Sequence, residues 1–183
     1  MLARLHEWWI AFVALWIATL PRLYRFMLQK QQIRRRRASK SIYESRLLQE
    51  RDIVNTEELV TFRKRTLYRQ TWTETEHPKA LIFFVHGLNS YSGKFARRVA
   101  ELTSRGYKVV GADLYGHGRS DGPHSYIPSV DDLVEDLNDH VEDLKKKPEN
   151  AGLPVFILGM SLGGLVTLKY SMKCTDCSFG LLN

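Results

Sequence analysis

The sequence is poor in cysteine, and it has no histidine after residue 140. Cys174 and Cys177 form one Cys-x-x-Cys, without the second pair that a four-ligand zinc site needs. We therefore predict two free thiols in a reducing compartment, and we expect no metal or organic cofactor. A reactive side chain beyond residue 140 therefore has no histidine after it in this sequence that could act as its general base.

No apolar run is long enough to cross a bilayer without help. Residues 8–20 are uncharged, but as a helix they would extend about 20 Å, against a hydrocarbon core of about 30 Å. The run contains tryptophans, which favour the headgroup region of a membrane. Basic residues that suit anionic lipid follow the run: Arg22, Arg25, Lys30, Arg34, Arg35, Arg36 and Arg37. We predict a membrane anchor or re-entrant helix with a basic flank in residues 1–37, and a membrane-associated protein.

Two other interpretations of this N-terminal region stay open. A cleaved secretory signal would need a basic start and a small-residue cleavage site, but Arg4 is offset by Glu7 and no such site follows the run. The basic cluster at residues 34–37 also suits a nucleic-acid or nuclear-import patch, although a cluster just after an apolar segment is more often a lipid or topology signal. We expect no nucleic-acid partner. If the segment spans a bilayer, the basic excess after it places the folded domain in the cytosol.

The length and the distribution of charge predict one globular domain behind a basic arm. With 183 residues, 44% hydrophobic and 26% charged, the chain suits one core and a short extra segment. The net charge is +7, but residues 1–70 hold 15 Lys and Arg against 6 Asp and Glu, whereas residues 71–183 hold 12 against 14. The basicity therefore belongs to the N-terminal arm and not to the domain that follows.

β-Rich and helical patterns alternate from residue 59 onward. We interpret residues 38–58 as a polar connector, and residues 59–62 and 66–72 as an antiparallel hairpin. The remaining pattern predicts buried strands with helices between them: strands 80–85, 107–112 and 155–158, and helices 95–105 and 130–147. This alternation predicts an α/β domain over residues 59–183, with a mostly parallel sheet and helices on both faces. The functional loops of such a sheet lie at the carboxyl ends of its strands.

The most informative motif is a Gly-x-Ser-x-Gly turn between the last predicted strand and a helical pattern. Ser161 lies at its centre, flanked by Gly159 and Gly163. A serine that projects its hydroxyl from such a turn needs a strained backbone, and larger side chains two residues away on either side would collide. The helix that begins at Leu162 directs free N–H groups toward the same place. The motif predicts Ser161 as a nucleophile.

A second glycine-bearing turn follows the buried strand 80–85. It contains His86 and Gly87, and the glycine has the backbone freedom to turn the next N–H inward. In nucleophile-elbow sites one oxyanion donor is the N–H after the nucleophile, here Leu162, and the other follows an earlier strand, for which Leu88 is the candidate. We interpret His86 as a support for this turn that bonds its own backbone, and not as the catalytic base.

Four sequence blocks carry a family resemblance: residues 83–88 (FFVHGL), 111–122 (GADLYGHGRSDG), 126–133 (YIPSVDDL) and 159–164 (GMSLGG). Together they resemble the α/β-hydrolase fold, within it the serine aminopeptidase S33-type group of monoacylglycerol lipases, lysophospholipases and caffeoylshikimate esterases, over about residues 58–183. The resemblance implies a serine hydrolase with Ser161 as nucleophile, Leu88 and Leu162 as oxyanion donors, and a carboxylic ester substrate such as a monoacylglycerol or lysolipid. It gives Asp113 and the loop 116–118 an architectural role.

Two departures from that group limit the implied activity. Met160 stands where the group often has His or Glu, and we expect this to alter the pocket lining more than the mechanism. In the group the triad acid and histidine follow the serine, but here only Asp176 follows and no histidine does. We therefore expect a C-terminally truncated hydrolase that is almost inactive alone, because loss of a triad member leaves little catalysis. A sheet cut at this point would also expose an unpaired edge that favours aggregation.

Two other functional classes stay open at this stage. The domain could be an inactive interaction module that uses the hydrolase scaffold, and Ser161 would then be dispensable. Alternatively, the basic arm could carry the function, by membrane targeting or nucleic-acid binding, with the domain incidental. The acyl length, the head group and the oligomeric state of an enzyme of this kind have no signal in the sequence.

Overall fold

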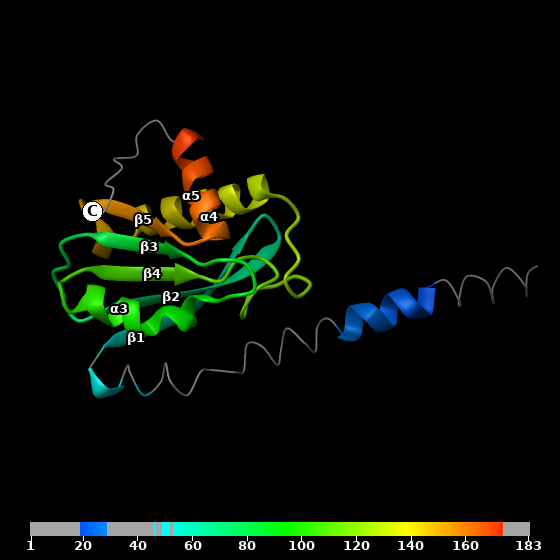
Figure 1. The fold of residues 1–183 in the computed structure, drawn as a ribbon, viewed down its shortest axis with the longest axis horizontal. Helices are drawn as coiled ribbons and strands as arrows, with labels where there is room; N and C mark the ends of the chain where they lie inside the picture. Colours follow the sequence, from blue (N-terminus) through cyan, green and yellow to red (C-terminus); the bar gives the residue numbers. More distant parts are fainter. Residues whose placement is uncertain (1–18, 29–45, 47–48, 52, 174–183) are drawn as a thin grey trace, which may run out of the picture.

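The described part of the chain folds around one mixed β-sheet. The computed structural model describes residues 19–28, 46, 49–51 and 53–173. The strands are β1 (Val54–Phe62), β2 (Arg65–Thr73), β3 (Leu81–Val85), β4 (Lys108–Ala112) and β5 (Val155–Gly159), in the order β1-β2-β4-β3-β5. β1 and β2 form an antiparallel hairpin and β2 is antiparallel to β4, whereas β3 is parallel to both β4 and β5. The predicted α/β class is confirmed (Figure 1).

Helices cover both faces of this sheet. A short 3-10 turn, η1 (Ser92–Phe95), leads into α3 (Ala96–Thr103) on one face, and α4 (Val130–Lys146) and α5 (Leu162–Lys173) lie on the other (Figure 1). The five residues of β3 are all buried, and they divide between the two faces because side chains alternate along a strand. Ile82 packs in the core beside α3, and Phe83 packs in the core beside α4 and α5. This double coverage explains why β3 is a continuous apolar run in the sequence.

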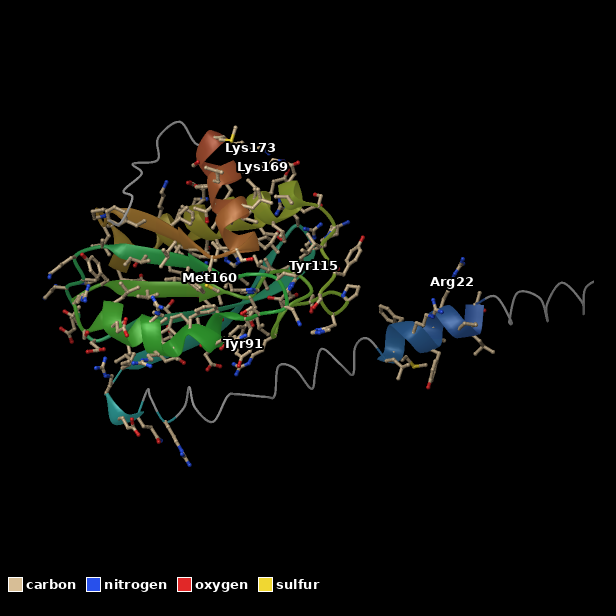
Figure 2. All side chains as sticks on the ribbon, viewed as in Figure 1. Arg22, Tyr91, Tyr115, Met160, Lys169 and Lys173 are labelled. Atoms are coloured by element: carbon tan, nitrogen blue, oxygen red, sulfur yellow. The ribbon has the colours of Figure 1, made fainter. Side chains whose placement is uncertain are left out.

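α4 and α5 pack together and support the end of β5. Ser129 caps α4 by accepting a hydrogen bond from the N–H of Asp132 at 3.0 Å. Asp131 pairs with Lys169 at 2.8 Å and with Lys173 at 2.9 Å, two lysines that Figure 2 shows on α5. Exposed pairs of this kind contribute about 0–1 kcal/mol each. The apolar contacts of α5 therefore carry most of the attachment, and they come from its buried Val166 and Tyr170.

Two boundaries of secondary-structure elements differ from those predicted. β1 begins at Val54 and not at residue 59, so the segment 38–58 that the pattern predicts as a connector includes the first part of a strand. The pattern misses it because β1 begins with polar residues, among them Glu57 and Glu58, which the fold holds in ion pairs with Arg119 and with Arg69 and Lys147. The helix predicted from residue 95 is also shorter, since α3 ends at Thr103.

The predicted membrane segment falls almost entirely outside the described residues. Of residues 8–20, only Thr19 and Leu20 are described, and they lie in a helix that the structure describes over residues 19–28. Within the described ranges, no helix is long and apolar enough to cross a bilayer. A transmembrane helix at residues 8–20 therefore stays a prediction.

β5 forms the second edge of the described sheet. It is bonded to β3 alone among the described strands, and all five of its residues are partly exposed. Several large apolar side chains near this edge are also exposed, among them Leu165, Leu168 and Met172 of α5. Residues 174–183, which follow α5, lie outside the described residues. An aggregation-prone edge at β5 stays a prediction, and the exposure of β5 and of the apolar side chains of α5 supports it.

Candidate active site

Ser161 lies on a strained turn between β5 and α5. Its φ angle is 55°, in the left-handed region that side-chain-bearing residues rarely adopt, at a cost of about 1–3 kcal/mol. The turn is closed by two hydrogen bonds: the N–H of Met160 donates to the Val85 carbonyl at 3.0 Å, and the N–H of Gly163 donates to the Met160 carbonyl at 2.9 Å. Ser161 is exposed, so its hydroxyl is accessible to a solvent-borne molecule.

Close backbone packing explains the glycines on both sides of Ser161. A Cβ at Gly159 would lie 2.3 Å from the Gly163 carbonyl oxygen and 2.4 Å from Thr167 Oγ1. A Cβ at Gly163 would lie 2.1 Å from the Val85 carbonyl oxygen. Each contact is far inside van der Waals distance, so α5 can begin directly above β3 and β5 only if both positions lack a side chain.

The loop after β3 lies against Ser161. A Cβ at Gly87 would be 3.1 Å from Ser161 Cβ and 3.6 Å from Ser161 Oγ. The structure therefore brings together two glycine-bearing turns that are far apart in the sequence and that follow parallel neighbouring strands. They meet because the carboxyl ends of parallel strands lie at the same edge of a sheet.

His86 is a structural residue in this arrangement. Its side chain is fully buried; Nδ1 donates to the Gly87 carbonyl at 2.7 Å, and Nε2 accepts from the Leu114 N–H at 2.9 Å. Burial lowers the pKa of His86 below its usual value, which favours the neutral ring that these two bonds require. With both nitrogens engaged, His86 has no nitrogen left to take a proton from Ser161.

The backbone N–H groups of Leu88 and Leu162 are the two candidate oxyanion donors. The Gly87–Leu88 peptide is trans, and in a trans peptide the C=O and N–H point in opposite directions. Because the Gly87 carbonyl faces His86, the Leu88 N–H is directed away from His86. Leu162 is the first residue of α5, where N–H groups have no acceptor within the helix. The Leu88 side chain itself is 56% exposed.

Asp113 joins the loops around the site. Its Oδ1 accepts from both the N–H and the hydroxyl of Ser92 at 2.7 Å, and its Oδ2 accepts from the Arg119 N–H at 2.8 Å. A Cβ at Gly118 would lie 2.0 Å from the same carboxylate. These contacts give Asp113 and the loop 116–118 a structural role. The partner Ser92 has no motif in the sequence and was not predicted.

The described residues contain no base in contact with the serine. Across residues 19–28, 46, 49–51 and 53–173, no hydrogen bond reaches the Ser161 hydroxyl. The ring of His117 is bonded through Nδ1 to the Tyr115 carbonyl. His140 lies on α4 between the rings of Phe62 and Phe83, where burial lowers its pKa to about 3. In the same described part of the chain, no cluster of His, Cys, Asp or Glu could hold a metal ion.

A groove runs beside the turn on the α3 face of the sheet. Its volume is about 340 Å³, and apolar side chains form most of its wall. Those lining residues include Phe84, Phe95, Leu102, Leu158 and Met160. Met160 is the neighbour of Ser161 and is 44% exposed, so the groove reaches the Ser161 turn; Figure 2 labels this residue.

Comparisons with known proteins agree with this geometry. Residues 76–182 match the family described as "Serine aminopeptidase, S33". The human monoglyceride lipase is 35% identical over 102 residues, which are 56% of this chain and 33% of that protein. The phospholipase YtpA of Bacillus subtilis (strain 168) is 32% identical over 100 residues, 55% of this chain and 37% of that protein. The chain therefore spans about a third of the length of these relatives.

A solved structure shows the same fold. A variant of monoglyceride lipase from Saccharomyces cerevisiae, in complex with a substrate analog, superposes with a TM-score of 0.60 at 22% sequence identity. The match covers 67% of this chain and 41% of the yeast protein. The described domain has the fold of an α/β-hydrolase.

Proposed function

Since the chain belongs to the serine aminopeptidase S33 family of hydrolases, we propose that it carries the nucleophile of a carboxylic ester hydrolase, and that this nucleophile is Ser161. The observation that supports this most directly is the Ser161 turn. Ser161 is exposed, lies against the Gly87 loop and has a φ of 55°, a backbone conformation that is energetically unfavourable for a residue with a side chain. Such strain is retained where function needs it.

The proposed chemistry is acyl transfer. The Ser161 oxygen attacks the ester carbonyl carbon and forms a tetrahedral intermediate whose oxyanion accepts hydrogen bonds from the N–H groups of Leu88 and Leu162. Collapse of the intermediate expels the alcohol and leaves an acyl-enzyme, which water then hydrolyses. The Ser161 proton needs an acceptor in the first step. Because no described residue supplies one, we propose that the 183-residue chain alone is nearly inactive.

A monoacylglycerol or a lysolipid is the substrate that we propose. The relatives that support this are a monoglyceride lipase and a phospholipase. The surface beside the turn is compatible with an acyl chain, because Leu88, next to Gly87, and Met160, next to Ser161, are both exposed apolar side chains. The groove that ends at Met160 adds further apolar surface.

A fluorophosphonate probe tests the nucleophile directly. We expect slow covalent labelling of the full chain that is lost in Ser161→Ala and retained in Ser104→Ala, a matched change of an exposed serine at the C-terminal end of α3. Monoacylglycerol hydrolysis, measured in parallel, should be close to the uncatalysed rate. Labelling that persists in Ser161→Ala would contradict the assignment, whereas complete absence of labelling would favour an inactive interaction module on this scaffold.

We also propose that the N-terminal region associates with membranes, with the hydrolase domain in the cytosol. Residues 8–20 are apolar and rich in tryptophan, and they precede the cluster Arg34, Arg35, Arg36 and Arg37. Co-sedimentation of the full chain with phospholipid vesicles tests this proposal. A chain that stays in the supernatant with both neutral and anionic vesicles would exclude it.

A further inference from the structure

The described N-terminal helix exposes an unusual amount of apolar surface. Every residue from 19 to 28 is exposed. Six of them are large apolar or aromatic side chains with 41–61% exposure: Leu20, Leu23, Tyr24, Phe26, Met27 and Leu28. Contiguous apolar surface of this kind marks a site of contact with a partner or a membrane.

Four large apolar side chains of this helix lie on the side opposite its two arginines. At 3.6 residues per turn, residues spaced i, i+3, i+4 and i+7 share one face, and Leu20, Leu23, Tyr24 and Met27 have this spacing. Arg22 and Arg25 are three residues apart and share the opposite side, where Phe26, four residues after Arg22, lies beside them; Figure 2 labels Arg22 on this helix. The helix is therefore amphipathic, with a wide apolar face and a narrow cationic one.

The charge around the helix is of one sign. Residues 8–43 contain eight Lys and Arg and no Asp or Glu. An acidic protein groove and an anionic lipid surface would both attract such a segment, but in the sequence the helix directly follows the uncharged, tryptophan-rich run that begins at residue 8. A helix with a broad apolar face, arginines opposite it and tryptophans nearby suits the boundary between lipid headgroups and acyl chains.

We propose that residues 19–28 lie parallel to the surface of an anionic phospholipid leaflet. In this orientation Leu20, Leu23, Tyr24 and Met27 insert among the upper acyl chains, and Arg22 and Arg25 contact lipid phosphates. A membrane-spanning orientation would instead bury both arginines in hydrocarbon, which is unfavourable. The inference refines the proposed membrane association and rests on it, but it is independent of the chemistry at Ser161.

Vesicle co-sedimentation of the full chain tests the two faces separately. On vesicles of phosphatidylcholine with phosphatidylserine, Leu23→Gln/Met27→Gln should lower the partition coefficient at least tenfold. Arg22→Gln/Arg25→Gln should lower it about fivefold per arginine, and should have almost no effect on pure phosphatidylcholine. A matched control, Leu59→Gln/Leu168→Gln, changes two exposed leucines of the hydrolase domain and should bind like the parent chain.

The outcomes separate this inference from the broader proposal. If the parent chain does not bind either vesicle, membrane association itself is wrong. If the parent binds but Leu23→Gln/Met27→Gln binds equally well, the helix 19–28 does not insert and the inference alone is wrong.

An environment-sensitive fluorophore tests the orientation. In a Cys174→Ser/Cys177→Ser background, a label on Tyr24→Cys should shift to the blue on anionic vesicles, and a label on Arg22→Cys should not. A blue shift at both positions would indicate a spanning helix and overturn the parallel orientation. No shift at either position would overturn insertion.

Discussion

The Leu114 N–H donates a hydrogen bond to His86 Nε2 at 2.9 Å, and this bond connects the loop after β4 to the loop after β3. On its other side the same ring holds the Gly87 carbonyl. His86 thus fixes the peptide whose N–H belongs to Leu88, although it does not contact Ser161 through either ring nitrogen. The proposed oxyanion donor depends on a neighbouring strand for its orientation.

Replacement of His86 by leucine should reduce both stability and reactivity. The change leaves the Leu114 N–H and the Gly87 carbonyl buried without partners, at about 1–3 kcal/mol each. We expect the free energy of unfolding, measured in urea, to fall by about 2–4 kcal/mol, and labelling of Ser161 to slow at least tenfold. His124→Leu, which changes an exposed histidine, is the control. Parent-like stability of His86→Leu would show that the two bonds contribute little.

Ser161→Gly should be more stable than Ser161→Ala. Glycine adopts a φ of 55° without a Cβ penalty, whereas alanine keeps the strain of the native serine. We expect a difference of about 1 kcal/mol in the free energy of unfolding, with labelling lost in both variants. Equal stability would mean that the turn stores no strain.

Gly163→Ala should disrupt the turn, and Gly164→Ala should not. A Cβ at Gly163 would lie 2.1 Å from the Val85 carbonyl oxygen, whereas at Gly164 the nearest atom, the Gly159 carbonyl oxygen, is 3.6 Å away. We expect Gly163→Ala to lose at least about 3 kcal/mol, in the range of severe core overpacking. Gly164→Ala should gain up to about 1 kcal/mol from helix propensity. Similar melting temperatures for the two variants would refute the packing argument.

The buried His140 should make the domain less stable in acid. Its pKa in the folded state is about 3, lowered first by burial and then by the nearby charge of Arg69, whereas an unfolded histidine titrates near its usual value of about 6.5. The unfolded chain therefore binds the proton first. This group has no effect on stability above that value, and it lowers stability by up to about 1.4 kcal/mol per pH unit as the pH falls from about 6.5 toward 3. Urea titrations of His140→Leu should show a shallower acid limb, and an unchanged limb would contradict the prediction.

The sequence by itself determined the features that depend on local spacing. The helix 130–147 and the buried strand 80–85 each carry their signal within one segment, as a helical period and as a continuous apolar run, so the sequence predicts both. The Gly159-x-Ser161-x-Gly163 turn can also be predicted from the sequence, because the positions that must lack a side chain for steric reasons are only two residues from Ser161. The start of β1 could not be predicted in this way, since its polar residues are held by ion pairs with distant residues, such as that of Glu58 with Lys147.

Tertiary structure alone decided which distant groups meet. The bond between His86 and Leu114 spans two loops, as does the pairing of Asp113 with Ser92, and no local pattern encodes either contact. The approach of Gly87 to Ser161 follows from the parallel pairing of β3 with β5. Spacing along the chain specifies which residues share a face of one element, but only the packing of the elements sets the distances between faces.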